Sequence, residues 1–153
     1  MHAWFGRSVL FVSAAPLMLL ACSTPEQPSE SLAAAEARWQ AAGVHSYDYI
    51  ITFSCQLCTL PSRPVSINVR SDTILSLTYA DDGSPLDTAA LRGYVTIDRT
   101  FQRLHQDLLT NPEVFTATYD PTFGYPRQVH IDMHANTADD EMTFSISTFA
   151  RIP

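Results

Sequence analysis

The sequence predicts an α+β fold in which helices cover one face of an antiparallel sheet of about six strands. A segment with helical periodicity is followed by three segments that alternate apolar and polar residues, and this order then occurs a second time. The links between the expected strands are too short for parallel crossovers, so the strands should pair antiparallel. The expected architecture is a two-layer sandwich with the element order α-β-β-β-α-β-β-β.

The first half begins with an expected helix that Ser29 can cap and Gly43 can terminate. Apolar residues recur there three and four positions apart, as one buried helix face requires: Leu32, Ala35, Trp39 and Ala42. Three segments with strand periodicity follow, and their apolar faces are Tyr47, Tyr49, Ile51 and Phe53; Val65, Ile67 and Val69; and Leu75, Leu77 and Tyr79. Residues 81–85, Asp-Asp-Gly-Ser-Pro, then break the chain.

The second half begins with a helix that should start near Thr96 and stop before Asn111. Its buried stripe is expected to consist of Ile97, Phe101, Leu104 and Leu108. Three further strands are expected over residues 114–119, 128–134 and 141–149. Because an antiparallel sheet can leave one face in water, the face away from the helices should be polar.

The composition limits the function. A formal net charge of -7 argues against a nucleic-acid-binding protein, which needs basic residues to neutralise phosphates. With 46% hydrophobic and 16% charged residues, the chain is typical of a globular domain. All nine basic residues are arginine, which excludes chemistry that depends on a lysine Schiff base or a P-loop lysine.

Residues 1–21 resemble the signal peptide of bacterial lipoproteins. A head with one positive charge, Arg7, precedes an uncharged stretch over residues 8–20, which is shorter than the about 20 residues of a membrane span. The stretch ends in Leu-Leu-Ala-Cys, which is similar to a lipobox. The resemblance implies cleavage after Ala21 and lipidation of Cys22, with a plain secretory signal cleaved elsewhere as the alternative.

Residues 22–31 contain this cysteine and a polar segment with prolines, which we expect to be a flexible tether to a single α+β domain over residues 32–153. The lipid on Cys22 would bind the protein to the membrane. In enteric lipoproteins an aspartate after the cysteine retains the protein at the inner membrane, and Ser23 occupies that position here. The expected location is therefore the cell envelope, at the outer membrane and facing the periplasm, with a Gram-positive source as the other option.

Cys55 and Cys58 are the cysteines that remain once Cys22 is lipidated. In an envelope compartment two nearby thiols by default form a disulfide. A redox-active pair is the alternative, but such pairs place the first cysteine at a helix N-terminus. Here Pro61 and Pro64 follow closely and the segment leads into a strand, so we predict a structural disulfide.

His130, Asp132 and His134 should share one face of the fifth strand. The ends of such a triplet lie about 13 Å apart on an extended strand, so one metal ion could not bind all three. Residues 139–141 are acidic but lack the spacing of an EF-hand loop. We interpret both groups as solvated surface and predict no metal ion and no other cofactor.

The turn sequence Tyr-Asp-Pro-Thr-Phe-Gly-Tyr-Pro at residues 119–126 is the centre of a family resemblance. It is accompanied by Tyr47-Asp48-Tyr49 ahead of Cys55, by Ile131-Asp132 on a late strand and by the acidic residues 139–141. Over roughly residues 37–150 the chain resembles small bacterial exported proteins and lipoproteins of domain of unknown function 6174. That family has no established activity, so the resemblance implies a fold and a compartment.

The same turn has two interpretations. Pro121 and Gly124 can shape it, and Pro126 can start a strand at a position where a missing N–H is tolerated. Alternatively, Phe123 and Tyr125 could form an exposed apolar loop tip. The first interpretation explains these residues by the shape of the turn and requires no binding role for them.

No motif of nucleophilic catalysis is present in the sequence, and we expect no enzyme. The prediction is a non-catalytic binding or interaction module that contacts an unidentified envelope protein or ligand. Its candidate binding surface is Phe123, Tyr125, His130, Asp132 and His134. A thiol-disulfide protein using Cys55 and Cys58, or an inhibitor-like domain using the exposed sheet face, are the alternatives.

Overall fold

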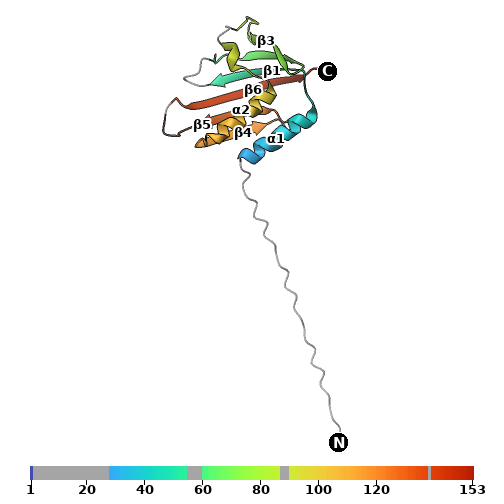
Figure 1. The fold of residues 1–153 in the computed structure, drawn as a ribbon, viewed down its shortest axis with the longest axis vertical. Helices are drawn as coiled ribbons and strands as arrows, with labels where there is room; N and C mark the ends of the chain where they lie inside the picture. Colours follow the sequence, from blue (N-terminus) through green and yellow to red (C-terminus); the bar gives the residue numbers. More distant parts are fainter. Residues whose placement is uncertain (2–27, 55–59, 87–89, 138) are drawn as a thin grey trace.

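The structure is a computed structural model that describes residues 1, 28–54, 60–86, 90–137 and 139–153. A six-stranded sheet forms one layer, and two helices pack on one of its faces (Figure 1). In chain order the elements are α1 (Pro28–Ala42), β1 (Tyr47–Ser54), β2 (Val65–Arg70), β3 (Thr73–Tyr79), the 3-10 helix η1 (Ala90–Gly93), α2 (Ile97–Leu109), β4 (Val114–Tyr119), β5 (Pro126–Asp132) and β6 (Glu141–Arg151).

The α+β character agrees with the prediction, but the predicted order α-β-β-β-α-β-β-β is wrong as a description of the sheet. The strands lie in the order β3-β2-β1-β6-β5-β4, and η1 stands between β3 and α2. The last strand, β6, pairs antiparallel with β1 from Tyr47–Arg151 to Ser54–Thr143. Periodicity shows which face of a strand is buried, but it does not show which strand is the neighbour.

The third strand differs from its predicted alternation. Asn68 on β2 pairs with Ser76 on β3, and Val69 pairs with Ile74, so Leu75 is the extra residue of a β-bulge. Leu75 is consequently 66% exposed, whereas Ile74 packs against the core. The predicted core position of Leu75 is therefore wrong, because one inserted residue reverses the alternation of the strand.

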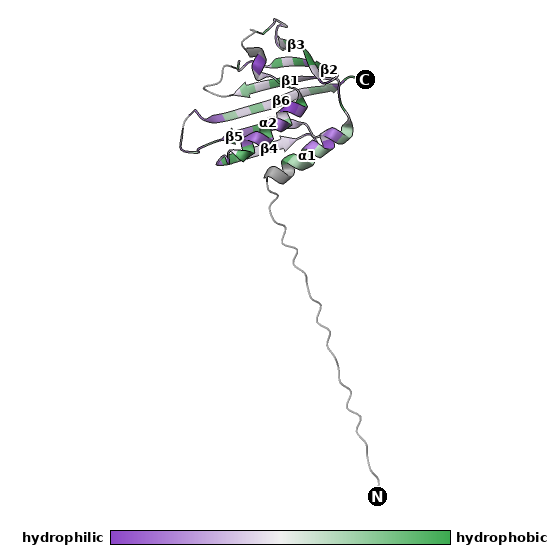
Figure 2. Cartoon of the chain, viewed as in Figure 1, coloured by the Kyte–Doolittle hydropathy of each residue, from purple (hydrophilic) through white to green (hydrophobic). Residues whose placement is uncertain are grey.

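The helices bury the stripes that their spacing predicts. Leu32, Ala35 and Trp39 of α1 are buried, as are Ile97 and its α2 partners, Phe101 and Leu104. α2 carries hydrophilic residues beside its hydrophobic ones (Figure 2). Among the described residues, no helix combines the length and the hydrophobicity that crossing a bilayer requires.

One continuous core lies between the helices and the sheet. At one end of it, the ring of Phe149 stacks on Tyr125 at 4.5 Å and on Tyr47 at 5.4 Å between centroids. The edge of the Trp39 ring meets Tyr47 at 5.3 Å. These aromatic contacts join α1 to the central strands β1 and β6, so the aromatic cluster fixes where α1 lies on the sheet.

Candidate functional site

A cavity of about 400 Å³ lies between α2, the segment before it and the sheet. Its size is within the range of about 300–1,000 Å³ that small-molecule sites occupy. Apolar and aromatic side chains supply most of its lining, chiefly Ile51, Phe53, Leu60, Leu104, Met142 and Phe144. The space is partly open to solvent, so it is a pocket at the edge of the core rather than a closed void.

Two buried tyrosines of β1 position the start of α2 over this cavity. The backbone N–H of Ile97 donates a hydrogen bond to the Tyr47 hydroxyl at 2.8 Å, and the Tyr49 hydroxyl donates to the carbonyl of Val95. Burial raises the pKa of both phenols above the usual value for tyrosine, so both stay neutral at physiological pH. The two hydroxyl groups therefore fix α2 on the sheet without placing a charge in the core.

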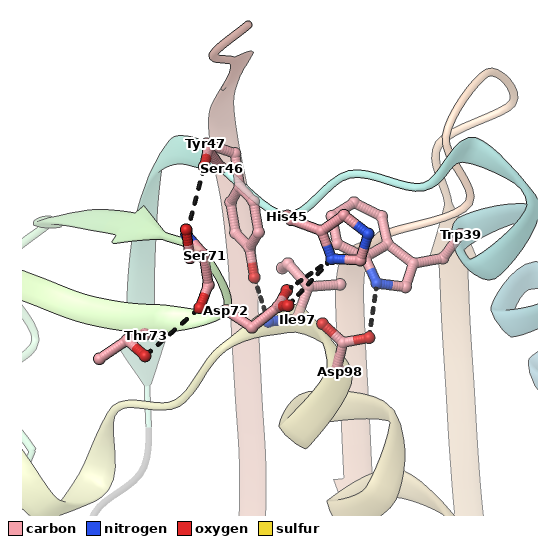
Figure 3. A network of polar contacts seen from close by, with 9 residues as sticks. All are labelled: Trp39, His45, Ser46, Tyr47, Ser71, Asp72, Thr73, Ile97 and Asp98. Carbon is pink, nitrogen blue, oxygen red and sulfur yellow. Dashed lines mark hydrogen bonds and ion pairs between the residues drawn. The ribbon is translucent and has the colours of Figure 1, made fainter.

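A polar network joins the same helix start to α1 and to the turn between β2 and β3 (Figure 3). The indole N–H of Trp39 donates to Asp98 at 3.1 Å, and His45 Nδ1 lies 2.9 Å from an oxygen of Asp72. Ser71 and Asp72 both have positive φ, as the central residues of a tight two-residue hairpin turn require. Three segments that are distant in sequence thus meet where α2 begins.

Tyr94 brings a polar group to the lining of the cavity. Its side chain is 5% exposed, and among the described residues its buried hydroxyl has no hydrogen-bond partner. Burial raises the pKa of Tyr94 to about 12, so the phenol keeps its proton at physiological pH. A buried donor without a partner is unfavourable, and a bound acceptor would relieve it.

Two charged residues of α2 also line the cavity. Arg103 donates from Nη1 to the carbonyl of Gly93 at 2.9 Å. Asp107 is half-buried, and burial raises the pKa of its carboxyl against the opposing effect of Arg103. The site is therefore apolar within and charged where α2 borders it.

Residues 31–151 match a family described as a family of unknown function, DUF6174. The chain belongs to this family. The match extends from α1 to the last residue of β6, so the sheet, both helices and the cavity are parts of the DUF6174 domain. The match confirms the predicted membership of DUF6174, and it begins at residue 31, earlier than the predicted residue 37. No curated protein sequence matches the chain.

Periodicity alone does not predict the cavity of the DUF6174 domain. Its lining comes from β1, β6, α2, the segment before α2 and Leu60 ahead of β2, and the meeting of these parts depends on the pairing of β1 with β6. The sequence does contain one indication of the cavity. Tyr94 and Val95 are apolar residues that lie directly before an expected helix and outside every expected element.

The cysteines lie outside the described residues. Lipidation of Cys22 and a disulfide between Cys55 and Cys58 both stay predictions.

The turn over residues 119–126 packs against α1 in the DUF6174 domain. Gly124 has a φ of 87°, and a Cβ there would lie 2.2 Å from the carbonyl oxygen of Ala35. Asp120 Oδ1 accepts the backbone N–H groups of Thr122 at 2.9 Å and of Phe123 at 2.7 Å. Tyr125 is 8% exposed, and Phe123 is half-buried with its ring 5.5 Å from that of Phe149. This arrangement favours the interpretation of the turn as structural.

The polar residues of the fifth strand lie elsewhere. β5 ends at Asp132, so the predicted extension of the strand to residue 134 is wrong and His134 lies in the following turn. His130 Nδ1 lies 2.9 Å from Thr143 Oγ1 on the face away from the helices, and His134 Nδ1 lies 2.8 Å from Asp140. Among the described residues, no group of three or more His, Cys, Asp or Glu side chains could bind a metal ion.

The five residues of the predicted binding surface are therefore not brought together. The two aromatic residues pack on the helix side of the sheet, whereas His130 alternates with the core residues Val129 and Ile131 and faces away from it. Binding by any of these five residues stays a prediction.

Proposed function

We propose that this chain is a lipid-anchored protein of the cell envelope whose DUF6174 domain binds a small apolar molecule without catalysing a reaction. The observation that carries the proposal is the cavity of about 400 Å³ under α2 with its largely apolar lining. Transferring apolar surface from water into such a space is favourable by roughly 25 cal/mol per Å². The Tyr94 hydroxyl, which has no hydrogen-bond partner among the described residues, supports a ligand that also carries one hydrogen-bond acceptor.

The expected lipid on Cys22 gives this function a physical context. Apolar molecules are poorly soluble in water and concentrate in bilayers, so a tethered domain would work beside their source. The part of the expected tether that precedes α1 would let the domain move at the membrane surface. A membrane anchor would thus place the binding cavity close to the apolar molecules that it binds.

The binding experiment uses the full chain carrying Cys22→Ser, which cannot be acylated. The probe is N-phenyl-1-naphthylamine, an uncharged dye that fluoresces in apolar surroundings. Met142 is half-buried and lines the cavity, so Met142→Trp should fill part of it. We expect saturable binding at one dye per chain, weakened about tenfold by Met142→Trp, which corresponds to roughly 1.4 kcal/mol.

The matched control is Met133→Trp. Met133 is also a half-buried methionine, but it does not line the cavity, and its sulfur accepts a hydrogen bond from Thr110 at 3.7 Å. Its substitution should leave dye binding unchanged, while chemical unfolding of both variants checks that each is folded. The proposed function would be contradicted if the dye showed no saturable binding. It would also be contradicted if the dye bound Met142→Trp as tightly as it binds the chain that retains Met142.

The anchor is tested separately by fractionation of cells that express the full chain. The chain with Cys22 should sediment with the membranes, and Cys22→Ser should appear in the soluble fraction. A Cys22→Ser chain that still sediments with the membranes would contradict lipid anchoring, without affecting the proposal for the cavity.

A further inference from the structure

A groove lined by several polar and charged residues lies beside the apolar cavity. Side chains of α2 form one side of this groove, chiefly Arg99, Gln102, Arg103 and Gln106. The turn between β2 and β3 forms the other side. Val95, Arg103 and Asp107 line both spaces, so the groove and the cavity are neighbours that share these three residues.

Two acidic and two basic side chains line the groove: Asp72, Asp107, Arg99 and Arg103. The Asp72 carboxylate lies 2.9 Å from Nδ1 of His45, which carries a charge only when it is protonated, and the carboxyl of Asp107 lies close enough to Arg103 for their charges to interact. Arg99 and Arg103 are four positions apart on α2, so their side chains lie on the same side of the helix. Among the described residues, the guanidinium of Arg99 makes neither an ion pair nor a hydrogen bond.

We infer that the ligand is a single-chain amphiphile, with its apolar tail in the cavity and an anionic head group in the groove at Arg99 and Arg103. This inference rests on the proposed function, because the tail requires the cavity. A guanidinium donates well to both carboxylate and phosphate oxygens, so fatty acids and single-chain phosphate lipids share the required chemistry.

The geometry also explains why one ligand would use both spaces. An apolar tail alone would leave the groove hydrated, and an anion alone would leave the cavity unfilled. The formal net charge of the chain is -7, so the long-range electrostatic interaction repels anions. Binding of an anionic head therefore depends on the local guanidinium groups, and the apolar tail supplies affinity that the head alone lacks.

The test compares four compounds with the same tail on the full chain carrying Cys22→Ser: dodecanoate, dodecyl phosphate, dodecanol and dodecyltrimethylammonium, each below its micelle concentration. We expect one or both anions to bind about fivefold more tightly than dodecanol, as an exposed ion pair of up to about 1 kcal/mol allows. The cation should bind most weakly. Whichever anion binds more tightly identifies the head-group source as carboxylate or phosphate.

Arg99→Gln supplies the specific variant, because Arg99 borders the groove and does not line the cavity. It should lower the affinity for dodecanoate to about that for dodecanol, and it should leave the affinity for dodecanol unchanged. Arg127→Gln is the control, since Arg127 is exposed on β5 and lines neither space. Added salt should weaken binding of the anions and spare the alcohol.

Two results would overturn the inference while the proposed function stands. One is dodecanol binding as tightly as both anions, and the other is an unchanged preference for anions in Arg99→Gln. If all four compounds and the uncharged dye fail to bind, the proposed function fails together with the inference. These outcomes separate an incorrect head-group assignment from an incorrect cavity assignment.

Discussion

Single polar atoms decide how α2 lies on the sheet. The Tyr47 hydroxyl accepts the N–H of Ile97, a group at the helix start that has no partner within the helix. The apolar face of β1 can be predicted from the spacing of Tyr47, Tyr49 and Ile51. The role of the hydroxyl cannot, because its partner lies 50 positions away in the chain.

Tyr47→Phe should lower the free energy of unfolding by about 1–3 kcal/mol, because it leaves the buried N–H of Ile97 without an acceptor. Urea unfolding followed by circular dichroism measures the change. Tyr79→Phe is the control: among the described residues the Tyr79 hydroxyl makes no hydrogen bond, and Arg63 can still stack on a phenyl ring. A loss equal to that of the control would show that the hydroxyl does not support α2.

Gly124 tests the packing of the turn on α1. Its positive φ alone disfavours a side chain by roughly 1–2 kcal/mol, and its Cβ would also collide with the Ala35 carbonyl oxygen. Gly124→Ala should therefore lower the free energy of unfolding by about 3 kcal/mol or more.

Gly83→Ala is the matched comparison, since Gly83 has a φ of 71° and no atom within 4 Å of its Cβ position. It should show only the conformational part, about 1–2 kcal/mol. Equal losses for the two variants would contradict a close contact between the turn and α1. The sequence indicates that Gly124 needs freedom in the turn, but it does not indicate this contact.

At the scale of elements, local patterns were predictable and long-range pairing was not. Thr96 caps α2 as its position before an apolar helical stripe suggests, with its hydroxyl accepting the N–H of Arg99 at 3.4 Å. The partner of β1 across the sheet is β6, at the far end of the chain. The cavity lies where β1, β6 and α2 meet. The sequence therefore does not predict the candidate site, because it does not predict that β1 pairs with β6.

The bulge in β3 gives a prediction that opposes the simple alternation. Leu75→Ser should change the free energy of unfolding by no more than about 0.5 kcal/mol, because Leu75 is an exposed extra residue. Ile74→Ser should lower it by about 1–3 kcal/mol, because Ile74 packs on the core. Thermal and urea unfolding of the two variants measure both effects, and the reverse ranking would place Leu75 in the core and exclude the bulge.

At the scale of the whole molecule, the buried titratable groups among the described residues are phenols rather than charged side chains. Burial raises the pKa of five of the six tyrosines: Tyr47, Tyr49, Tyr94, Tyr119 and Tyr125. For Tyr94 and Tyr119 the pKa reaches about 12. They belong to β1, β4, the segment before α2 and the turn before β5, so their ionisation is coupled to the integrity of the entire domain.

This burial predicts that the domain loses stability at alkaline pH. The folded state keeps its phenolic protons above pH 10, where the unfolded chain has released them, so its stability is complete below about pH 10 and falls as the pH rises toward the folded-state pKa values. Each buried tyrosine should contribute a slope of up to about 1.4 kcal/mol per pH unit.

Urea unfolding between pH 8 and 12, with tyrosinate absorbance recorded in parallel, measures this dependence. Tyr94→Phe should reduce the slope above pH 10, since it removes one phenol whose pKa burial raises to about 12. Stability that stays constant to pH 12 would contradict the burial of these hydroxyl groups. Tyr94 also lines the cavity, so a bound ligand can accept a hydrogen bond from its hydroxyl. Such a ligand should stabilise the folded domain and shift the alkaline unfolding transition to higher pH.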